Sequence, residues 1–426
     1  MYIMLDIKFI RENKDLVAAG AKKKHIDFDV EALVAVDDKR RTLTTEIEKK
    51  RAEQNAVSDR IVKVSDATER AKLIFEMKLL KENLQKEEEE LKTVMTDWQR
   101  LMLAVPNIPD MSVPEGDSDK ENKEIKKWSE PTKFSFAPKN HAELLESLGM
   151  LSLERGVKVS GFRGYFLTGD AARLEFALWQ FVNDFFFKKG DWKHMIVPSL
   201  VRRETLMGTG YIPGGEDDLY KTQDGEFLSG TAEVATMAYH MDEVLDKKRL
   251  PVKFISFSDA FRREAGAHGK DIKGILRVHE FYKWEQVVLC EASHETSVKH
   301  HEEIERNTEE ITEALGLPYH VVINCGSDLG LGQVKKYDIE VWLPSENAYR
   351  ETGSASYFHD FQTRRLNIRY RDDDGKLKFV HSLNNTALSG RPLIAIVENY
   401  QNVDGSIRVP EVLVPYMNGQ TVISKK

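Results

Sequence analysis

The sequence predicts an α+β fold in which an N-terminal antiparallel helical hairpin precedes a domain built on a mostly antiparallel β-sheet. Residues 30–104 indicate the hairpin, because they contain neither glycine nor proline and their apolar residues recur at alternating spacings of three and four, as in a coiled coil. Short strand-like segments downstream indicate the sheet, because several are joined by loops too short for a helical crossover. A chain of 426 residues has room for both parts.

A break near the middle of the periodic segment divides it into two helices. The register fails at residues 65–69, where Asp66 and Glu69 form a helix-start signal. One uninterrupted helix is the alternative. Two helices of roughly 33 to 37 residues would each reach roughly 50 Å at 1.5 Å per residue. Pro106, Pro109 and Pro114 end the second helix, so we expect an N-terminal domain over 1–107, a linker over 108–132 and a second domain over 133–426.

The second domain is expected to mix strands with long helices. The strand-like segments are 252–261, 277–289, 320–324 and 337–343, and the helical segments are 171–188 and 294–315. His300 and His301 lie among polar residues of the last helix, which predicts that they face solvent.

Composition excludes several classes of protein. The net charge is −8, and no apolar run approaches the 18 residues that a membrane span needs. Because the start also lacks a cationic and then apolar signal, we expect no membrane association and a cytoplasmic protein. Cys290 and Cys325 are too few for a disulfide framework and are expected to be reduced thiols, although one pair remains arithmetically possible. P-loop, HExxH and GxSxG patterns are missing from the sequence, and zinc is unsupported.

The chemistry-bearing residues gather in two segments that flank a polar loop. The first is FRREAG at 261–266 and the second is RVHEFYKWE at 277–285. If both are strands, Arg262 and Glu264 share one face of the first. On the returning strand, one face carries Arg277, His279, Phe281, Lys283 and Glu285. An arginine, a carboxylate and a ring could hold a phosphate, an exocyclic amine and a base plane. A solvated hairpin with cross-strand ion pairs is the alternative.

Ordered motifs over most of the chain resemble the seryl-tRNA synthetases, which are class II aminoacyl-tRNA synthetases. The motifs are MLDIKFIREN at 4–13, TAE at 231–233, FRREAG at 261–266, KYDIEVWLP at 336–344, YRE at 349–351, DFQTRRLNIRYR at 360–371 and ENYQ at 398–401, with the helical hairpin in its expected place. The resemblance implies a class II catalytic domain over 133–426. It also implies an enzyme that joins serine to ATP as seryl-adenylate and then transfers serine to the 3′ end of tRNA(Ser), with tRNA(Sec) as a second candidate acceptor.

The resemblance implies a role for each residue of the nucleotide site. Arg262 would bridge the amino-acid carboxylate and the α-phosphate, and Phe281 would stack on adenine while Glu264 accepts from its amino group. Arg391 would cover the other face of the nucleotide, and Glu351 would hold Mg²⁺. The further residues that this implies for ATP binding are Arg263, Thr352, Gly353 and Ser354, with Ser354 as a second magnesium ligand.

The serine pocket and the partners are implied in the same way. The expected serine-binding residues are Thr231, Ala232, Glu233, Arg262, Glu285, Asn384 and Thr386. A buried carboxylate such as Glu285 would penalise alanine, which offers no hydroxyl. Residues 157–198 resemble the motif that forms the dimer interface in this family, so we expect a homodimer. Without the resemblance, the same segment would be interpreted as an internal helix and strand.

The tRNA contacts are expected on basic residues of the hairpin and of the loop 266–274. They are Lys39, Arg40, Arg41, Lys49, Lys50 and Arg51 on the hairpin and Lys270 and Lys273 on the loop. On spacing alone, the hairpin clusters are typical of a solvated helix face.

Some positions depart from the family pattern. Gly230 stands where many members have proline, Gly353 interrupts a serine pair, Thr386 replaces the commoner serine, and the segment 384–391 is about one residue short. Two alternatives stay open, an inactive synthetase-like binding protein and an enzyme that loads serine onto a carrier protein.

Overall fold

The computed structural model describes residues 5–266, 269, 271 and 274–425. These residues divide into two compact units, one over 5–22 and 26–106 and the other over 23–25 and the described residues from 107 to 425. Lys270 and Lys273 lie outside the described residues. None of the described helices is long and apolar enough to cross a membrane.

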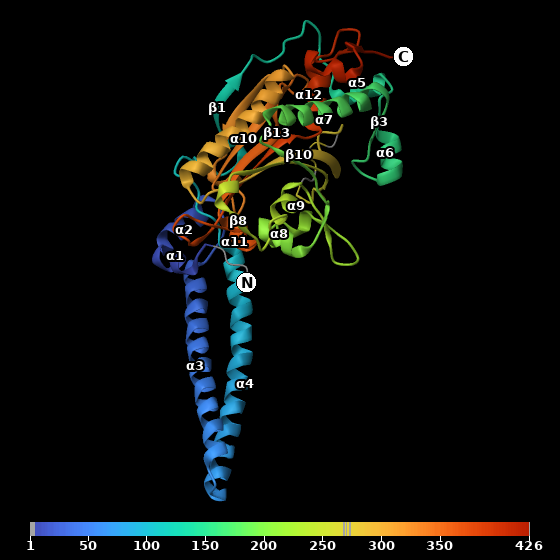
Figure 1. Ribbon diagram of the computed structural model, residues 1–426. Coiled ribbons are helices and arrows are strands. Elements are labelled where there is room, and N and C mark those ends of the chain that lie inside the picture. Colours follow the sequence, from blue (N-terminus) through green and yellow to red (C-terminus); the bar gives the residue numbers. More distant parts are fainter. Residues whose placement is uncertain (1–4, 267–268, 270, 272–273, 426) are drawn as a thin grey trace. The chain divides into compact units, whose positions relative to one another are not determined.

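The first unit is the helical hairpin with two short helices before it (Figure 1). Its helices are α1 (Ile7–Glu12), α2 (Lys14–Lys23), α3 (Val30–Lys63) and α4 (Ala67–Ala104). The predicted break is confirmed: α3 ends at Lys63, and the Asp66 carboxylate caps α4 by accepting from the backbone N–H groups of Thr68 and Glu69. At about 1.5 Å per residue, the 34 residues of α3 and the 38 of α4 span about 51 and 57 Å.

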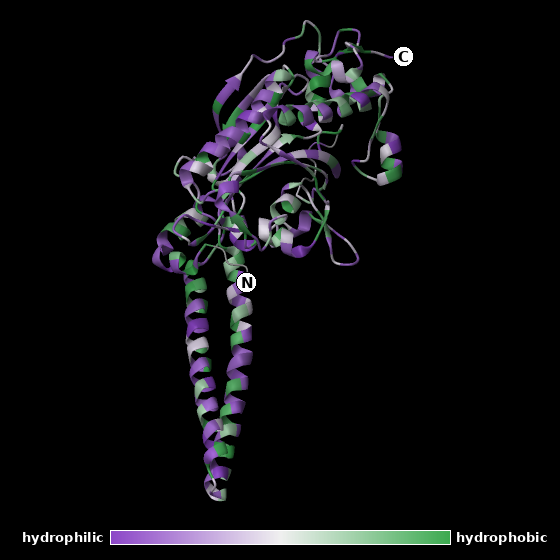
Figure 2. Ribbon diagram, viewed as in Figure 1, coloured by the Kyte–Doolittle hydropathy of each residue, from purple (hydrophilic) through white to green (hydrophobic). Residues whose placement is uncertain are grey.

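The apolar residues that recur at spacings of three and four form a seam, most of which is buried where the two long helices pack together. Hydrophobic and hydrophilic turns alternate along both of them in Figure 2, as expected for helices that bury one stripe. The seam residues that the structure buries are Leu33, Leu43, Ile47, Val57, Leu73, Met77, Leu84, Val94 and Trp98.

The second unit is organised by a sheet that has eight strands within the described residues. The strands, in spatial order, are β1 (Lys123–Trp128), β11 (Tyr319–Ile323), β12 (Lys335–Leu343), β13 (Ala348–His359), β16 (His381–Leu388), β10 (Glu280–Cys290), β9 (Val252–Phe261) and β4 (Lys193–Ile196). Neighbours run antiparallel except β4 and β9, which confirms the predicted α+β class. Strand β1 lies inside the segment expected to be a linker.

Smaller elements complete this unit. The helices are α5 (His141–Ser147), α6 (Leu153–Ser160), α7 (Gly169–Lys189), α8 (Arg203–Thr209), α9 (Glu233–Ala238), α10 (His294–Ala314), α11 (Phe361–Arg365) and α12 (Arg391–Asn399). The remaining strands are β2 (Leu151–Ser152), β3 (Phe166–Leu167), β5 (Leu200–Val201), β6 (Tyr220–Lys221), β7 (Phe227–Leu228), β8 (Val244–Asp246), β14 (Arg369–Arg371), β15 (Leu377–Phe379), β17 (Ile407–Arg408) and β18 (Val422–Ile423).

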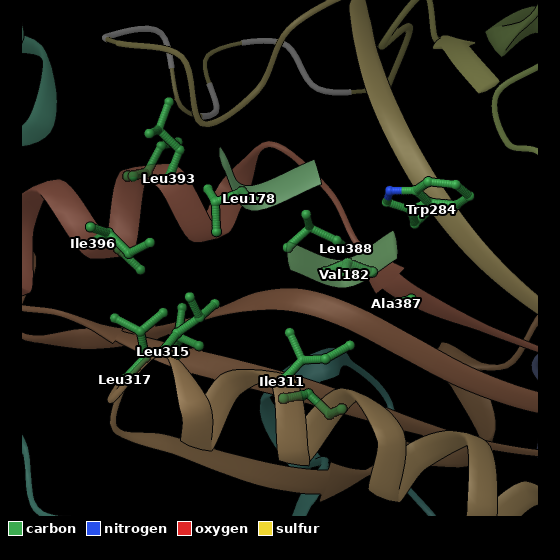
Figure 3. Close-up of a cluster of buried hydrophobic side chains, with 14 of the residues drawn as sticks. Leu178, Val182, Trp284, Ile311, Leu315, Leu317, Ala387, Leu388, Leu393 and Ile396 are labelled. Carbon is green, nitrogen blue, oxygen red and sulfur yellow. The ribbon is translucent and has the colours of Figure 1, made fainter. Parts of the chain in front are cut away.

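The core packs helices against both faces of the large sheet. In Figure 3 the strands pass between α12, which carries Leu393 and Ile396, and α10, which carries Ile311. Leu388 of β16 and Trp284 of β10 belong to the same buried cluster. Because α10 covers one face of the central strands, their polar side chains on the other face are left to form a site.

The prediction that His300 and His301 face solvent is wrong. Both are buried. The Nε2 atom of His301 lies 3.0 Å from the Ala355 carbonyl oxygen, and its ring stacks on Tyr337. The sequence signal failed because α10 also buries polar residues such as Asn307 and Glu309, whose hydrogen bonds replace water.

Candidate active site

A cavity lies beside the central strands on the side away from α10. Gln286 of β10 donates to the Ile304 carbonyl oxygen of α10, so its neighbour Glu285 points to the opposite face. Residues from β10, β13, β16 and the start of α12 line the cavity. The predicted site residues among them are Arg262, Glu264, Phe281, Glu351, Thr352, Thr386 and Arg391.

One end of the cavity presents two arginines and an aromatic ring. Arg262 follows β9, its Nε donates to the Gly230 carbonyl oxygen at 3.3 Å, and its guanidinium carbon is 5.6 Å from the Phe281 ring centre. Arg391 is the first residue of α12, and its Nη1 donates to the Glu351 carbonyl oxygen at 2.6 Å. Two cations and a ring can neutralise phosphate charge and stack on a base.

Arg263 and Glu264 lie in the loop after β9 and not in a strand as predicted. Strand β9 ends at Phe261 and β10 begins at Glu280, so the expectation of strand at Arg262–Glu264 and at residues 277–279 is wrong. Glu264 has φ of +56°, a left-handed conformation that is uncommon for a residue with a side chain. Its Oε2 accepts from Nη1 of Arg277 at 2.6 Å. The Arg263 guanidinium donates to the Asp217 carbonyl oxygen instead of lining the cavity.

The cavity is also lined by a buried lysine, Lys283, and the buried carboxylate of Glu285 lies next to it without lining the cavity itself. Glu285 lies opposite Thr386 of β16 in the strand register, and its Oε2 is 2.6 Å from Nζ of Lys283. The same Nζ is 3.2 Å from Oγ1 of Thr231. Burial raises the pKa of Glu285 to about 7, and the charge of Lys283 opposes this rise. The sequence places Lys283 on this face but assigns it no role.

Glu233 belongs to a second buried network. Its carboxylate accepts from the amide of Gln362 at 2.6 Å and from the hydroxyl of Tyr211 at 2.9 Å. Burial raises the pKa of Glu233, while hydrogen bonds from Gln362, Tyr211 and Asn384 counteract the increase. The sequence analysis missed Tyr211 and Gln362. For Gln362 the signal was available, because it lies inside the DFQTRR motif. Ala232 is buried immediately before α9.

Glu351 and Ser354 lie on the part of β13 that contains a bulge. The bulge inserts Thr352 opposite β12 between the pairs Glu351–Glu340 and Gly353–Ile339. Glu351 and Thr352 consequently both border the cavity, and alternation puts Ser354 on the face of Thr352. Gly353 and Ser354 themselves do not line it.

The Glu351 carboxylate is favoured in its charged form. Burial alone would raise the pKa of Glu351, but the charges of Arg391, Lys336 and Arg262 outweigh burial and hold the pKa below its usual value. Among the described residues, no group of three or more histidine, cysteine or acidic side chains could hold a metal ion. The Glu351 carboxylate fits Mg²⁺, which commonly keeps waters and takes one or two carboxylates plus substrate phosphates, whereas Ser354 does not line the cavity.

Four of the six hairpin residues predicted to contact tRNA already form ion pairs within the hairpin. Lys39 pairs with Glu90, Arg40 with Asp37, Lys50 with Glu87 and Arg51 with Glu88. Arg40 also lies over the Trp98 ring. Arg41 and Lys49 are exposed, and neither forms an ion pair with any residue that the structure describes.

The segment 157–198 exposes large apolar side chains. It contains the second half of α6 and all of β3, α7 and β4. Phe176 is 73% exposed, Phe187 75% and Ile196 88%. Phe176, Ile196 and the neighbouring Met195 and Phe257 line one hollow. Contiguous exposed apolar surface of this kind is typical of an interface.

Two family models match the chain. The model described as "Seryl-tRNA synthetase N-terminal domain" matches residues 4–109, and "tRNA synthetase class II core domain (G, H, P, S and T)" matches residues 220–400. The second range contains every predicted residue of the nucleotide and serine sites.

Curated proteins and solved structures agree along the whole chain. The serine–tRNA ligase of Deinococcus radiodurans is 43% identical over 99% of both chains, and that of Thermodesulfovibrio yellowstonii is 44% identical over 97% of this chain and 99% of its own. The seryl-tRNA synthetase of Pyrococcus horikoshii, solved with ATP, has a TM-score of 0.90 at 36% identity over 99% of this chain and 100% of its own. The Naegleria fowleri cytoplasmic enzyme, solved with AMP, has a TM-score of 0.87 at 31% identity over 100% of both chains. With both family models and full-length relatives in agreement, the chain belongs to the seryl-tRNA synthetase family.

Proposed function

We propose that the protein activates L-serine with ATP and transfers it to the 3′ end of tRNA(Ser). The observation that carries this proposal is one cavity lined by Arg262, Arg391 and Phe281 and also by Lys283, whose Nζ is 2.6 Å from the buried carboxylate of Glu285. Relatives solved with ATP or AMP and named serine–tRNA ligases support the same reaction. They favour aminoacylation over an inactive or carrier-directed protein.

The reaction needs no covalent nucleophile from the protein. An oxygen of the serine carboxylate attacks the α-phosphorus of ATP, and the bond to the leaving pyrophosphate breaks. A hydroxyl of the terminal tRNA ribose then attacks the activated carbonyl, and AMP leaves. Arg262 is suited to neutralise the charge that develops on the α-phosphate, and the cavity holds the reactants together. Phe281 and Arg391 would hold the two faces of adenine.

Two further residues of the cavity would fix the nucleotide. Glu351, held charged by three cations, would hold Mg²⁺ with Ser354 nearby. When bound, Mg²⁺ would neutralise phosphate charge. Glu264 would accept from the adenine amino group with the oxygen that Arg277 leaves unused.

Serine would be recognised beside Lys283 and Thr386, which line the cavity. Glu285 would accept from the substrate hydroxyl, with Thr231, Ala232, Glu233, Asn384 and Thr386 forming the surrounding wall. Alanine offers no hydroxyl to this buried carboxylate, which is a strong basis for rejection.

The hairpin would bind the tRNA. It carries no candidate catalytic group, and helices of about 51 and 57 Å are longer than a stabilising pair requires. Arg41 and Lys49 are the favoured phosphate contacts, because their charges are not already paired within the described hairpin. If the hairpin recognises mainly the shape of the RNA backbone, tRNA(Sec) would also be charged when it presents the same shape.

We also infer a homodimer through residues 157–198. The support is the exposed apolar surface of Phe176, Phe187 and Ile196. We place the reaction in the cytoplasm, where the free and buried Cys290 and Cys325 would stay reduced.

ATP–pyrophosphate exchange with each of the twenty amino acids tests the proposal. Serine with magnesium is expected to support exchange, and alanine and threonine are expected to support at least 100-fold less. Equal exchange with alanine would contradict the proposed pocket. Aminoacylation of purified tRNA(Ser) then tests the transfer step, and a mass measurement over a range of concentrations tests the dimer.

A further inference from the structure

Lys283 is a buried lysine with two pocket residues as its partners. Its Nζ is 2.6 Å from Oε2 of Glu285 and 3.2 Å from Oγ1 of Thr231. Only 11% of the side chain is exposed, and the residue borders the cavity. A lysine is costly to bury unless its charge is compensated, so this position is built around the pair with Glu285.

The other charged groups around Glu285 do not replace this lysine. Glu233 of α9 opposes a negative charge on Glu285, and Arg262 after β9 favours it less strongly than Lys283 does. Tyr211 is a further titratable neighbour, and burial raises its pKa well above the usual value, so it is neutral. Lys283 therefore supplies the main compensation for a charged Glu285.

The strand beside Lys283 and Glu285 presents two small polar side chains to them. Ser258 and Ser256 of β9 lie directly opposite these two residues in the register. Both hydroxyl oxygens are buried and have no hydrogen-bond partner among the described residues. The surroundings of the pair are therefore polar but supply no further charge from this strand.

We propose that Lys283 is a positioning residue for amino-acid selection: it fixes Glu285 as a charged acceptor and holds Thr231 beside it, so that the pocket binds a substrate hydroxyl. The inference rests on the proposed serine activation and adds a residue to it. An ionised carboxylate can only accept, so it selects a ligand that donates, such as the serine hydroxyl. A protonated carboxylic acid carries a donor of its own and selects the hydroxyl less well. Selection of serine over alanine thus depends on the lysine as well as on the carboxylate.

Burial and Lys283 have opposite effects on the pKa of Glu285, so loss of the lysine charge should make serine binding depend on pH. Burial raises the pKa of Glu285, and Lys283 lowers it. Removing the lysine charge leaves the weaker effect of Arg262 to oppose burial, so the pKa of Glu285 rises above about 7 and Glu285 becomes mostly protonated at neutral pH. Raising the pH then restores the carboxylate. Each unit of such a shift changes the charged fraction about tenfold at pH values below the pKa.

The test is serine-dependent ATP–pyrophosphate exchange by the full chain between pH 6.5 and 8.5. Lys283→Met keeps the length of the side chain and removes its charge. At pH 7 we expect KM for serine to rise about 10-fold to 100-fold, the preference for serine over alanine to fall, and KM for ATP to stay within about twofold. As pH rises to 8.5, KM for serine should fall toward that of the unaltered protein.

Lys253 provides a matched control. Lys253 lies on β9, is also nearly buried, and has its Nζ 2.6 Å from a carboxylate oxygen of Asp191. Unlike Lys283, it does not border the cavity. Lys253→Met should leave KM for serine and its pH dependence unchanged. A similar rise in KM in both variants would overturn the inference.

A double variant keeps the test decisive if the single change prevents folding. Glu285→Gln with Lys283→Met removes both charges, so no buried charge is left alone. If Lys283 acts through Glu285, the double variant binds serine as Glu285→Gln does, and additive losses would overturn the inference. An unchanged or pH-independent KM in an active Lys283→Met protein would also overturn it. No serine-dependent exchange in the unaltered protein would instead overturn the proposed function, and the inference with it.

Discussion

The helical hairpin and the sheet that carries the cavity bury their apolar residues over very different distances along the chain. In the hairpin, α3 packs on α4, the next helix in the sequence. In the sheet, β10 lies between β9, which precedes it closely, and β16, which comes after five further strands and two α-helices. A local pattern determines the first region, and long-range pairing determines the second.

This difference also separates the two parts of the proposed function. The hairpin repeats the same helix–helix packing along its length. Its proposed role therefore depends on how long it is and on which of its cations are not already paired with carboxylates. The cavity depends on single side chains such as Arg262 and Glu285, whose neighbours come from remote segments. We expect single substitutions to act strongly in the cavity and weakly in the hairpin.

The largest effect is expected for Arg262→Ala. Because Arg262 is placed to neutralise the α-phosphate, pyrophosphate exchange should fall at least about 1,000-fold, equivalent to about 4 kcal/mol of transition-state stabilisation. Arg263→Ala is the control, since the Arg263 guanidinium contacts the Asp217 carbonyl oxygen, and it should reduce exchange less than about tenfold. Near-normal exchange by Arg262→Ala would contradict the assigned role.

A shortened hairpin should separate activation from transfer. Replacing residues 47–91 by a short glycine linker removes the outer part of α3 and α4 while leaving the described contacts of the second unit intact. Exchange should stay within about twofold, whereas aminoacylation of tRNA(Ser) at low tRNA concentration should fall about 100-fold or more. If the shortened protein charges tRNA(Ser) normally, the hairpin is not the tRNA-binding arm.

Within the hairpin, free and paired cations should differ. Arg41→Ala combined with Lys49→Ala should weaken tRNA binding about tenfold and reduce the slope of log affinity against log salt by about 1 to 2. Arg51→Ala removes a cation that already pairs with Glu88 and should change the slope less. Binding titrations at several salt concentrations measure both, and a larger change for Arg51→Ala would reverse the assignment.

The smallest effect concerns acid sensitivity, which should be confined to the catalytic unit. Burial lowers the pKa of His301 to about 4. A histidine with a lowered folded pKa destabilises the folded state as pH falls from the unfolded value of about 6.5 toward 4, because the unfolded chain binds more protons. Between pH 6.5 and 5.5 this costs about 1 kcal/mol.

His301→Gln should remove that part of the pH dependence while keeping a donor to the Ala355 carbonyl oxygen. Denaturant unfolding followed by tryptophan fluorescence would measure it, since most tryptophans lie outside the hairpin. Residues 30–104 contain no histidine, so the helical signal of the hairpin should lack this dependence. An unchanged pH slope in His301→Gln would contradict the assignment.

Periodicity and capping were enough to predict the hairpin. The break before Asp66 and most of the buried seam follow from local sequence. The strand 252–261 was also predicted with its observed bounds. Pairing partners within the hairpin could not be predicted, because whether Lys50 meets Glu87 depends on the rotation of both helices.

The cavity was predictable only through its motifs. Periodicity did not identify β13 and β16 as strands, although they carry Glu351 and Thr386, because both are buried on both faces and lack a simple alternation. The left-handed backbone at Glu264 and the bulge at Thr352 depend on tertiary contacts. The contact of Lys283 with Thr231 joins two segments 52 residues apart, so the sequence alone could not indicate the proposed role of Lys283.

The internal pairing of the hairpin's cations has a consequence for competition among RNAs. A surface of free cations attracts every polyanion, so non-cognate tRNA would occupy it for much of the time. With Lys39, Arg40, Lys50 and Arg51 already neutralised by their own carboxylates and a net charge of −8, long-range attraction is weak. Encounters are then short unless the shape of the RNA fits, which leaves residence time, rather than capture rate, to distinguish one tRNA from another.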